Sequence, residues 1–108
     1  MGEYVQVSTA VADQQAGAGL ARSAVEARLA ASAQVTGPAL SAYWHLDEFG
    51  QGEEWRVLFK TTAARYPQLE AHLLAHHPWS NPEVVAVPLT SGARAYLDWI
   101  DRVTAPDA

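Results

Sequence analysis

The first third of the chain alternates apolar and polar positions with two different periods. In YVQVSTA, residues 4–10, Val5 and Val7 alternate with other side chains, which is typical of a strand with one buried face. From about Asp13 to Ala31 the apolar residues recur every three or four positions. This spacing predicts a helix, with Asp13 as the cap at its start. The chain is therefore expected to begin with a strand followed by a helix.

Two further strands are predicted between residues 40 and 60. The first is LSAYWHL, residues 40–46, which follows a break at Gly37-Pro38. Residues 47–52, DEFGQG, predict a turn. In WRVLFK, residues 55–60, large apolar side chains alternate with Arg56, Leu58 and Lys60, so one face of this strand is expected to be buried.

The second half of the sequence predicts a helix, a short strand and a last helix. Thr62 is expected to cap the helix and Pro67 suits one of its early positions. Pro78 ends it, because proline disfavours helical geometry in the preceding residue. VVAVPL, residues 84–89, predicts a fourth strand, and Ser91 is expected to start the last helix. The buried face of that helix should comprise Tyr96, Leu97, Ile100 and Val103.

The order of these elements is β-α-β-β-α-β followed by a helix, which is the split βαβ arrangement of the ferredoxin-like fold. We therefore predict an α+β fold with an antiparallel sheet, helices on one face and an extra C-terminal helix. Residues 1–108 are expected to form a single domain that is ordered from about 4 to 104. The fold alone does not identify a function, because it hosts many unrelated activities.

Charge and residue types exclude several classes of function. The 7 Lys and Arg against 12 Asp and Glu give a formal net charge of −5, so nucleic acid is not an expected partner. The absence of cysteine excludes disulfides, thiolate zinc sites and a cysteine nucleophile, and fits a reducing compartment. No apolar run approaches the ~20 residues of a membrane span, and the N-terminus lacks a signal-peptide pattern. We therefore expect a cytoplasmic protein with no membrane partner.

Four segments, in order along the chain, carry a family resemblance. They are ARSAVEARLAAS, SAYW, LFKTT, and HHPWSNPEVVAVPL with AYLDWI behind it. Together they resemble the CutA divalent-cation-tolerance family over residues 4–100, most specifically in the His-Pro-aromatic-x-x-Pro-Glu pattern of residues 77–83. The resemblance implies a ferredoxin-like homotrimer, similar in assembly to the PII signalling proteins. In such a trimer, long strands of one subunit extend the sheet of the next.

The resemblance also implies a metal site, from which one ligand is missing. Metal binding in the family is attributed to a cysteine in the first strand, a histidine before the His-Pro and a glutamate after the second Pro. Ser8, His76 and Glu83 occupy these positions here. Serine supplies a neutral oxygen in place of a soft thiolate. We therefore expect no required cofactor, and at most weak binding of Cu or Zn by His76 and Glu83.

From residue types alone, the segment HHPWSNPE, residues 76–83, has two interpretations. Imidazole and carboxylate groups suit Zn or Cu(II). However, His76 and His77 fall at a helix end, whose partial negative charge favours a cationic side chain. The prolines on both sides of Trp79 stiffen the chain. We expect a rigid structural connection first and a weak metal site second.

Tyr43 and Trp44 are adjacent in a predicted strand and must point to opposite faces. Both cannot be buried in one small core. Either a subunit interface covers one of them, or the tryptophan lies over the helices of its own subunit. An exposed aromatic on a long strand favours aggregation in a monomer, which makes the interface the preferred interpretation.

Three hypotheses for function remain. The first is a non-enzymatic trimeric protein of the CutA type, associated with divalent-metal tolerance. The second, by analogy with PII trimers, is a signalling module that binds an anionic small molecule in clefts between subunits. Lys60, the only lysine, would hold the anion, unless it is simply a solvated side chain. The third is an enzyme that uses His76 or His77 with Glu83 as acid and base, but the sequence contains no matching catalytic motif.

Overall fold

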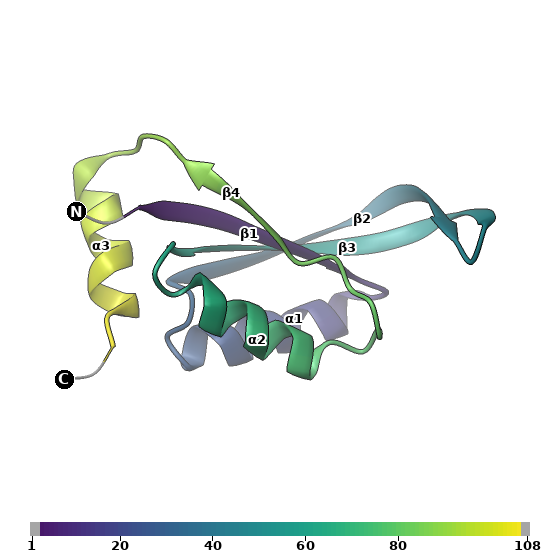
Figure 1. Cartoon of the computed structure of the whole chain (residues 1–108), viewed down its shortest axis with the longest axis horizontal. Coiled ribbons are helices and arrows are strands. Elements are labelled where there is room, and N and C mark those ends of the chain that lie inside the picture. The colour runs from purple at the N-terminus through teal and green to yellow at the C-terminus, as the bar shows by residue number, and fades with distance from the viewer. Residues whose placement is uncertain (1–2, 107–108) are drawn as a thin grey trace.

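The chain folds into one antiparallel sheet with helices packed against it (Figure 1). The computed structural model describes residues 3–106. Within them the strand order is β2-β3-β1-β4, and every neighbouring pair is antiparallel. This arrangement confirms the predicted α+β fold. The elements are β1 (Tyr4–Val11), α1 (Gln14–Glu26), β2 (Ser32–His45), β3 (Glu48–Thr62), α2 (Tyr66–His76), β4 (Val85–Leu89) and α3 (Arg94–Thr104).

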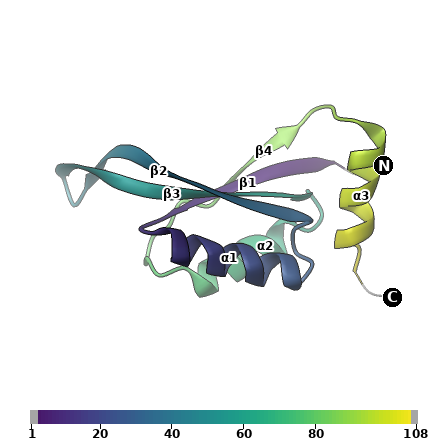
Figure 2. The same cartoon turned by 180° about the vertical axis from the view of Figure 1, so that it is seen from behind.

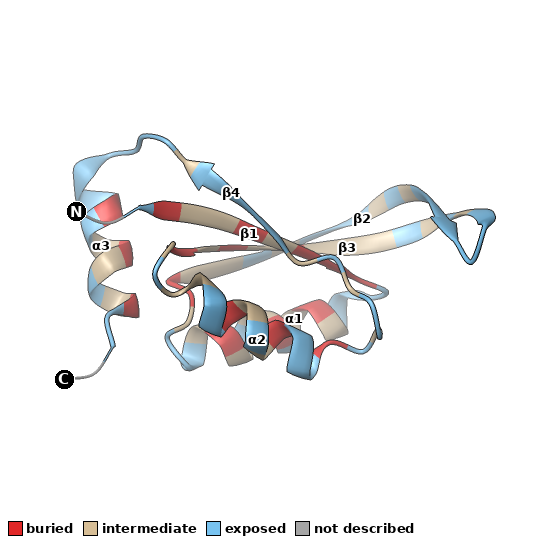
Figure 3. Ribbon diagram, viewed as in Figure 1, coloured by how far each residue is buried: buried red, intermediate tan, exposed pale blue. Residues whose placement is uncertain are grey.

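The main core lies between the sheet and the pair formed by α1 and α2, which cover the same face (Figure 1, Figure 2). Val57 and Phe59 of β3 are fully buried there, together with Leu69 and Leu73 of α2 (Figure 3). Each such side chain contributes about 1.5–3 kcal/mol relative to an exposed position. The predicted alternation in β3 is therefore confirmed, and Lys60 lies on the face turned away from these helices.

Helix α1 ends at Glu26, five residues before the predicted end at Ala31. Arg28 adopts a left-handed backbone conformation with φ 61°. Its N–H donates to Val25 O, and the Leu29 N–H donates to Ala24 O. These two bonds form a Schellman motif, which satisfies carbonyls that the helix end leaves free. The expectation of a longer helix was wrong, because this C-cap uses an arginine at the position that usually carries glycine.

Strand β2 continues through the dipeptide that was expected to interrupt it. The register with β3 shifts between Thr36 and Ala39, so Gly37 and Pro38 form an irregularity inside one strand. A side chain at Gly37 would meet the indole of Trp55, whose Cδ2 lies 2.8 Å from the position of a Cβ. Glycine therefore allows the Trp55 ring to lie directly on the neighbouring strand.

The turn between β2 and β3 is shorter than predicted. Leu46 and Asp47 are its central residues and both have positive φ, 51° and 64°. Positive φ at both central positions matches a type I′ hairpin turn. Gly50 and Gly52, which suggested a longer turn, instead lie within β3. The ring of Tyr43 lies against Gly50, where a Cβ would come within 2.7 Å of Cε1.

Helix α3 lies beyond the end of the sheet, beside the start of β1 (Figure 1, Figure 2). It begins at Arg94 and not at Ser91. Leu97 and Ile100 are buried as predicted, but Tyr96 is exposed. A second apolar cluster joins α3 to the sheet through Tyr4, Ala31, Leu97 and Ile100. No helix within residues 3–106 is long and apolar enough to span a membrane.

Candidate functional site

The segment after α2 is a helix end followed by an extended connection. The helix ends at His76, and His77 has extended backbone angles of φ −73° and ψ 140°. The N–H of His77 donates to Leu73 O at 2.8 Å and closes the last turn. Pro67 occupies one of the first two helical positions, as expected. The predicted helix end before Pro78 is confirmed.

His77 is a structural residue with both ring nitrogens engaged. Its Nε2 lies 2.8 Å from the carbonyl oxygen of Ala10, and its Nδ1 lies 3.0 Å from the backbone nitrogen of Trp79. A carbonyl oxygen only accepts, so Nε2 carries the proton and Nδ1 accepts the Trp79 N–H. The side chain is 9% exposed. Neither nitrogen is free for a metal ion or for proton transfer within the described residues.

His76, in contrast, is exposed and retains a free nitrogen. Its Nδ1 lies 2.8 Å from the carbonyl oxygen of His72 and donates to it. This bond leaves the lone pair on Nε2, the form of imidazole that binds metals. The rings of His72 and His76 stack, with centroids 4.2 Å apart and planes inclined by 28°.

His72 was not singled out from the sequence, although it lies four residues before His76. Its Nε2 is 2.9 Å from the hydroxyl oxygen of Ser23 on α1. Burial lowers the pKa of the His72 imidazole, and the neighbouring charge of His76 lowers this pKa further. A histidine pair at spacing i and i+4 was the sequence signal for this arrangement.

Glu83 is engaged by Arg56, and its carboxylate is not free. Arg56 donates from Nη1 to Oε1 and from Nη2 to Oε2, both at 3.0 Å. The hydrogen bonds that Arg56 donates to Glu83 raise the pKa of the Arg56 guanidinium. The two side chains are 33% and 40% exposed, so a bidentate pair of this kind contributes at most about 1 kcal/mol. The alternation in β3 predicts that Arg56 lies on the face opposite Val57 and Phe59, but it does not indicate the partner of Arg56.

The predicted ligands do not form a three-residue cluster in one chain. Ser8 lies between Val7 and Thr9, which are buried on the helix-covered face, so its side chain points to the opposite face. His76 belongs to α2, which packs on the covered face. Within residues 3–106, no three histidine, aspartate or glutamate side chains are grouped closely enough to hold a metal ion. A metal site at His76 and Glu83 stays a prediction.

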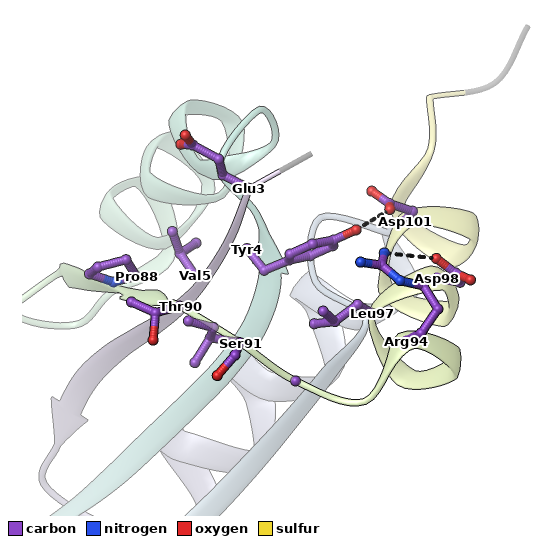
Figure 4. Close-up of a pocket in the computed structure, with 12 residues that line it drawn as sticks. Glu3, Tyr4, Val5, Pro88, Thr90, Ser91, Arg94, Leu97, Asp98 and Asp101 are labelled. Carbon is purple, nitrogen blue, oxygen red and sulfur yellow. Dashed lines mark hydrogen bonds and ion pairs between the residues drawn. The ribbon is translucent and has the colours of Figure 1, made fainter. Parts of the chain in front are cut away.

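Lys60 is half-buried and lies in register with Gln6 of β1 and Ser32 of β2. It does not line the surface hollow between the start of β1, the end of β4 and helix α3 (Figure 4). The charged groups of that hollow are largely paired: Arg94 lies 3.4 Å from Asp98, and Asp101 accepts the Tyr4 hydroxyl. An anion site at Lys60 likewise stays a prediction.

Comparison with known proteins identifies the family. The model for the CutA1 divalent ion tolerance protein family matches residues 5–103. The chain belongs to this family. The divalent-cation tolerance protein CutA of Thermus thermophilus is 38% identical over 85 residues, which cover 79% of this chain and 82% of that protein. The chloroplastic protein CutA of Arabidopsis thaliana is 31% identical over 100 residues, and the match spans 55% of its length.

Solved structures of CutA proteins support the same assignment. The crystal structure of CutA1 from Shewanella sp. SIB1 superimposes with a TM-score of 0.92 at 29% identity, covering 96% of this chain and 97% of that one. The fold of the CutA family and that of this chain therefore agree along nearly the whole sequence. Because Ser8 takes the place of the cysteine that the resemblance implies, this CutA chain lacks a thiolate at its first strand.

Proposed function

We propose that this CutA chain acts as a non-enzymatic homotrimer in tolerance of divalent cations, inside the cytoplasm. The names of its relatives supply the link to divalent cations. The assembly is inferred from the distribution of apolar surface. Function then depends on binding and assembly instead of turnover.

The observation that carries this proposal is the apolar surface of the β2–β3 hairpin. The ring of Trp44 is 75% exposed and packs edge-on against Phe49, itself 59% exposed, with centroids 6.0 Å apart. Leu40 and Leu46 on the same hairpin are 80% and 84% exposed. Several apolar side chains at this level of exposure on one hairpin are typical of an interaction surface. We infer that a second copy of the same chain covers this surface.

The two edges of the sheet support the same proposal. Strands β2 and β4 are the edge strands, and each leaves one row of backbone N–H and C=O groups that no other strand within residues 3–106 pairs with. Val85 and Val87 of β4 are 48% and 51% exposed. Pairing of an edge in one copy with an edge in the next would satisfy both rows and cover these valines. A closed ring of three such contacts leaves no free edge.

Light scattering of the purified chain at micromolar concentration tests the assembly. A homotrimer has three times the 11.7 kDa mass of one chain. We expect this mass in the presence of a chelator as well, because the contacts that we invoke involve no metal. A monomer at these concentrations would contradict the proposal.

Metal binding is the second part of the proposal, and we expect it to be weak. His76 offers a free Nε2, whereas Glu83 must first leave Arg56. Breaking that ion pair reduces the net gain from carboxylate coordination. Cu²⁺ and Zn²⁺ suit neutral imidazole, with Cu²⁺ the tighter of the two.

A further inference from the structure

We propose that His72 and His76 together form a divalent transition-metal site on the surface of helix α2, one that does not use Glu83. The assignment rests on the proposed metal binding in so far as both involve His76. It differs in the second ligand, which comes from the same helix and not from the segment before β4. The expected ion is Cu²⁺, with Zn²⁺ or Ni²⁺ bound more weakly.

The first support is the position of the two side chains on one helix. Residues four apart lie on the same helical face, with Cβ atoms about 5–6 Å apart. His72 and His76 already bring their rings to a centroid separation of 4.2 Å. The helix therefore keeps both ligands close. Because the two rings stack with planes inclined by only 28°, the ring of His72 must rotate to direct a nitrogen to an ion held by Nε2 of His76.

The second support is the hydrogen bond at Nδ1 of His76, which sets the tautomer of its neutral ring. Its Nδ1–H donates to the backbone carbonyl of His72, which fixes the ring orientation and leaves Nε2 unprotonated. Histidines that bind metals usually donate their other ring N–H to a carbonyl or carboxylate in this way. His76 therefore has the outer hydrogen bond of a metal ligand before any ion is present.

Ser23 gives His72 a comparable arrangement. The hydroxyl of Ser23 donates to the carbonyl of Leu20 at 3.3 Å, so its oxygen is available to accept a hydrogen bond from the Nε2–H of His72, which lies 2.9 Å away. The lone pair of His72 is then on Nδ1. Each ring of the pair thus offers one unprotonated nitrogen, whereas both nitrogens of His77 are already bonded to backbone groups.

The electrostatic surroundings favour a cation at this position. His76 is the last residue of α2, where the free carbonyls give the helix end a partial negative charge. His72 is half-buried and His76 is exposed, so an ion can reach the pair from solvent and keep water in its other coordination positions. A site with only two protein ligands should exchange its ion readily.

The test is a titration of the full chain with Cu²⁺. Calorimetry measures the affinity, and electron paramagnetic resonance reports how many nitrogen atoms coordinate the ion. The variants are His72→Ala, His76→Ala and Glu83→Gln, with His45→Ala as the matched control for loss of an exposed histidine. We expect His72→Ala and His76→Ala each to weaken binding by more than about tenfold, since even outer-shell partners of a metal ligand are worth about 10- to 100-fold. His45→Ala should leave the affinity unchanged, and Glu83→Gln should lower it by less than either histidine variant does, because Arg56 already holds the Glu83 carboxylate.

The outcomes separate this site from the pair suggested by the family. Loss of binding in His76→Ala and Glu83→Gln but not in His72→Ala would overturn the two-histidine site and support His76 with Glu83. Unchanged binding in His72→Ala overturns our assignment in every case. If His72→Ala fails to fold, His72→Gln takes its place. The spectrum of the wild-type complex should show two coordinated nitrogens that become one in either histidine variant.

Discussion

At the scale of single residues, three histidines within six positions have different chemistry because their neighbours differ. His77 donates to Ala10 O and accepts from Trp79 N, so both nitrogens are used. His76 donates to a carbonyl of its own helix and retains a lone pair. His72 contacts a hydroxyl group, which can donate or accept. The sequence alone does not distinguish the adjacent residues His76 and His77. Their hydrogen bonds make His76 a candidate metal ligand and His77 a structural residue.

The lowered pKa of His72 predicts a pH dependence of stability. Burial and the charge of His76 make the native state bind the His72 proton less readily than the unfolded chain, in which the imidazole has its ordinary pKa of 6.5. Above pH 6.5 neither state is protonated and the full stability is present. As the pH falls below 6.5 the unfolded chain gains the proton first, so the free energy of unfolding decreases until the pH passes the native pKa.

The measurement is urea unfolding between pH 7.5 and about 5 in a chelating buffer, at one fixed protein concentration because assembly also contributes to stability. His72→Gln should show a smaller decrease than wild type across this range. His45→Ala, which removes a histidine from the exposed hairpin, is the control and should follow wild type. An identical decrease in wild type and His72→Gln would contradict the assigned cause.

The candidate site could be predicted only in part from the sequence, for a physical reason. The helix end at Pro78 follows from the covalent geometry of proline, which is local, and this prediction was correct. The ion pair between Arg56 and Glu83 joins residues 27 positions apart. It depends on how β3 and the connection to β4 meet in space. A family pattern identifies Glu83 but contains no information on which cation holds it in this chain.

At the scale of elements, the termini of helices and strands were the main source of error. The predicted helix over 13–31 had the correct start, because Asp13 accepts the N–H of Ala16 at 2.8 Å. Its end was missed because Arg28 takes the left-handed conformation without the usual glycine. The hairpin turn was misplaced for the same reason, since Leu46 and Asp47 carry its positive φ angles. Side-chain periodicity predicted the order of the elements correctly. The end of α1 and the turn between β2 and β3 were misplaced because non-glycine residues adopt positive φ there.

The strained C-cap of α1 predicts that replacement of Arg28 by glycine gives a more stable protein than its replacement by alanine. Arg28→Gly should raise the free energy of unfolding by about 1 kcal/mol relative to Arg28→Ala, because glycine adopts positive φ without the steric cost of a Cβ. Alanine is the matched reference, since both variants lose the 3.2 Å hydrogen bond from the Arg28 guanidinium to Val103 O. Thermal or urea unfolding of the two variants gives the difference. Equal stability, or a more stable alanine variant, would show that the cap is not strained.

At the scale of the whole molecule, the elongated shape leaves one end of the sheet outside the part that the helices cover. The principal extents are 46 × 26 × 21 Å, and the β2–β3 hairpin projects beyond the part of the sheet that the helices cover (Figure 1, Figure 2). An isolated two-stranded ribbon is only marginally stable in water. The ring of Tyr43 lies against Gly50, whereas Trp44 has Phe49 as its only aromatic neighbour among residues 3–106. Tyr43 and Trp44 were predicted not to be buried in the same core. Trp44 is the more exposed of the two and is therefore the residue that we expect a partner to cover.

Trp44 is accordingly the residue whose loss should most weaken assembly. Trp44→Ala should shift the trimer towards smaller species on dilution, because truncation of a buried aromatic anchor typically costs about 2 kcal/mol or more per interface. Trp79→Ala is the matched control: its ring is half-buried within its own chain and lies 5.2 Å from the ring of His77. That variant should lower the melting temperature while the trimer persists. Light scattering over a dilution series measures both, and equal loss of trimer in the two variants, or none in either, would mean that Trp44 is not the anchor between subunits.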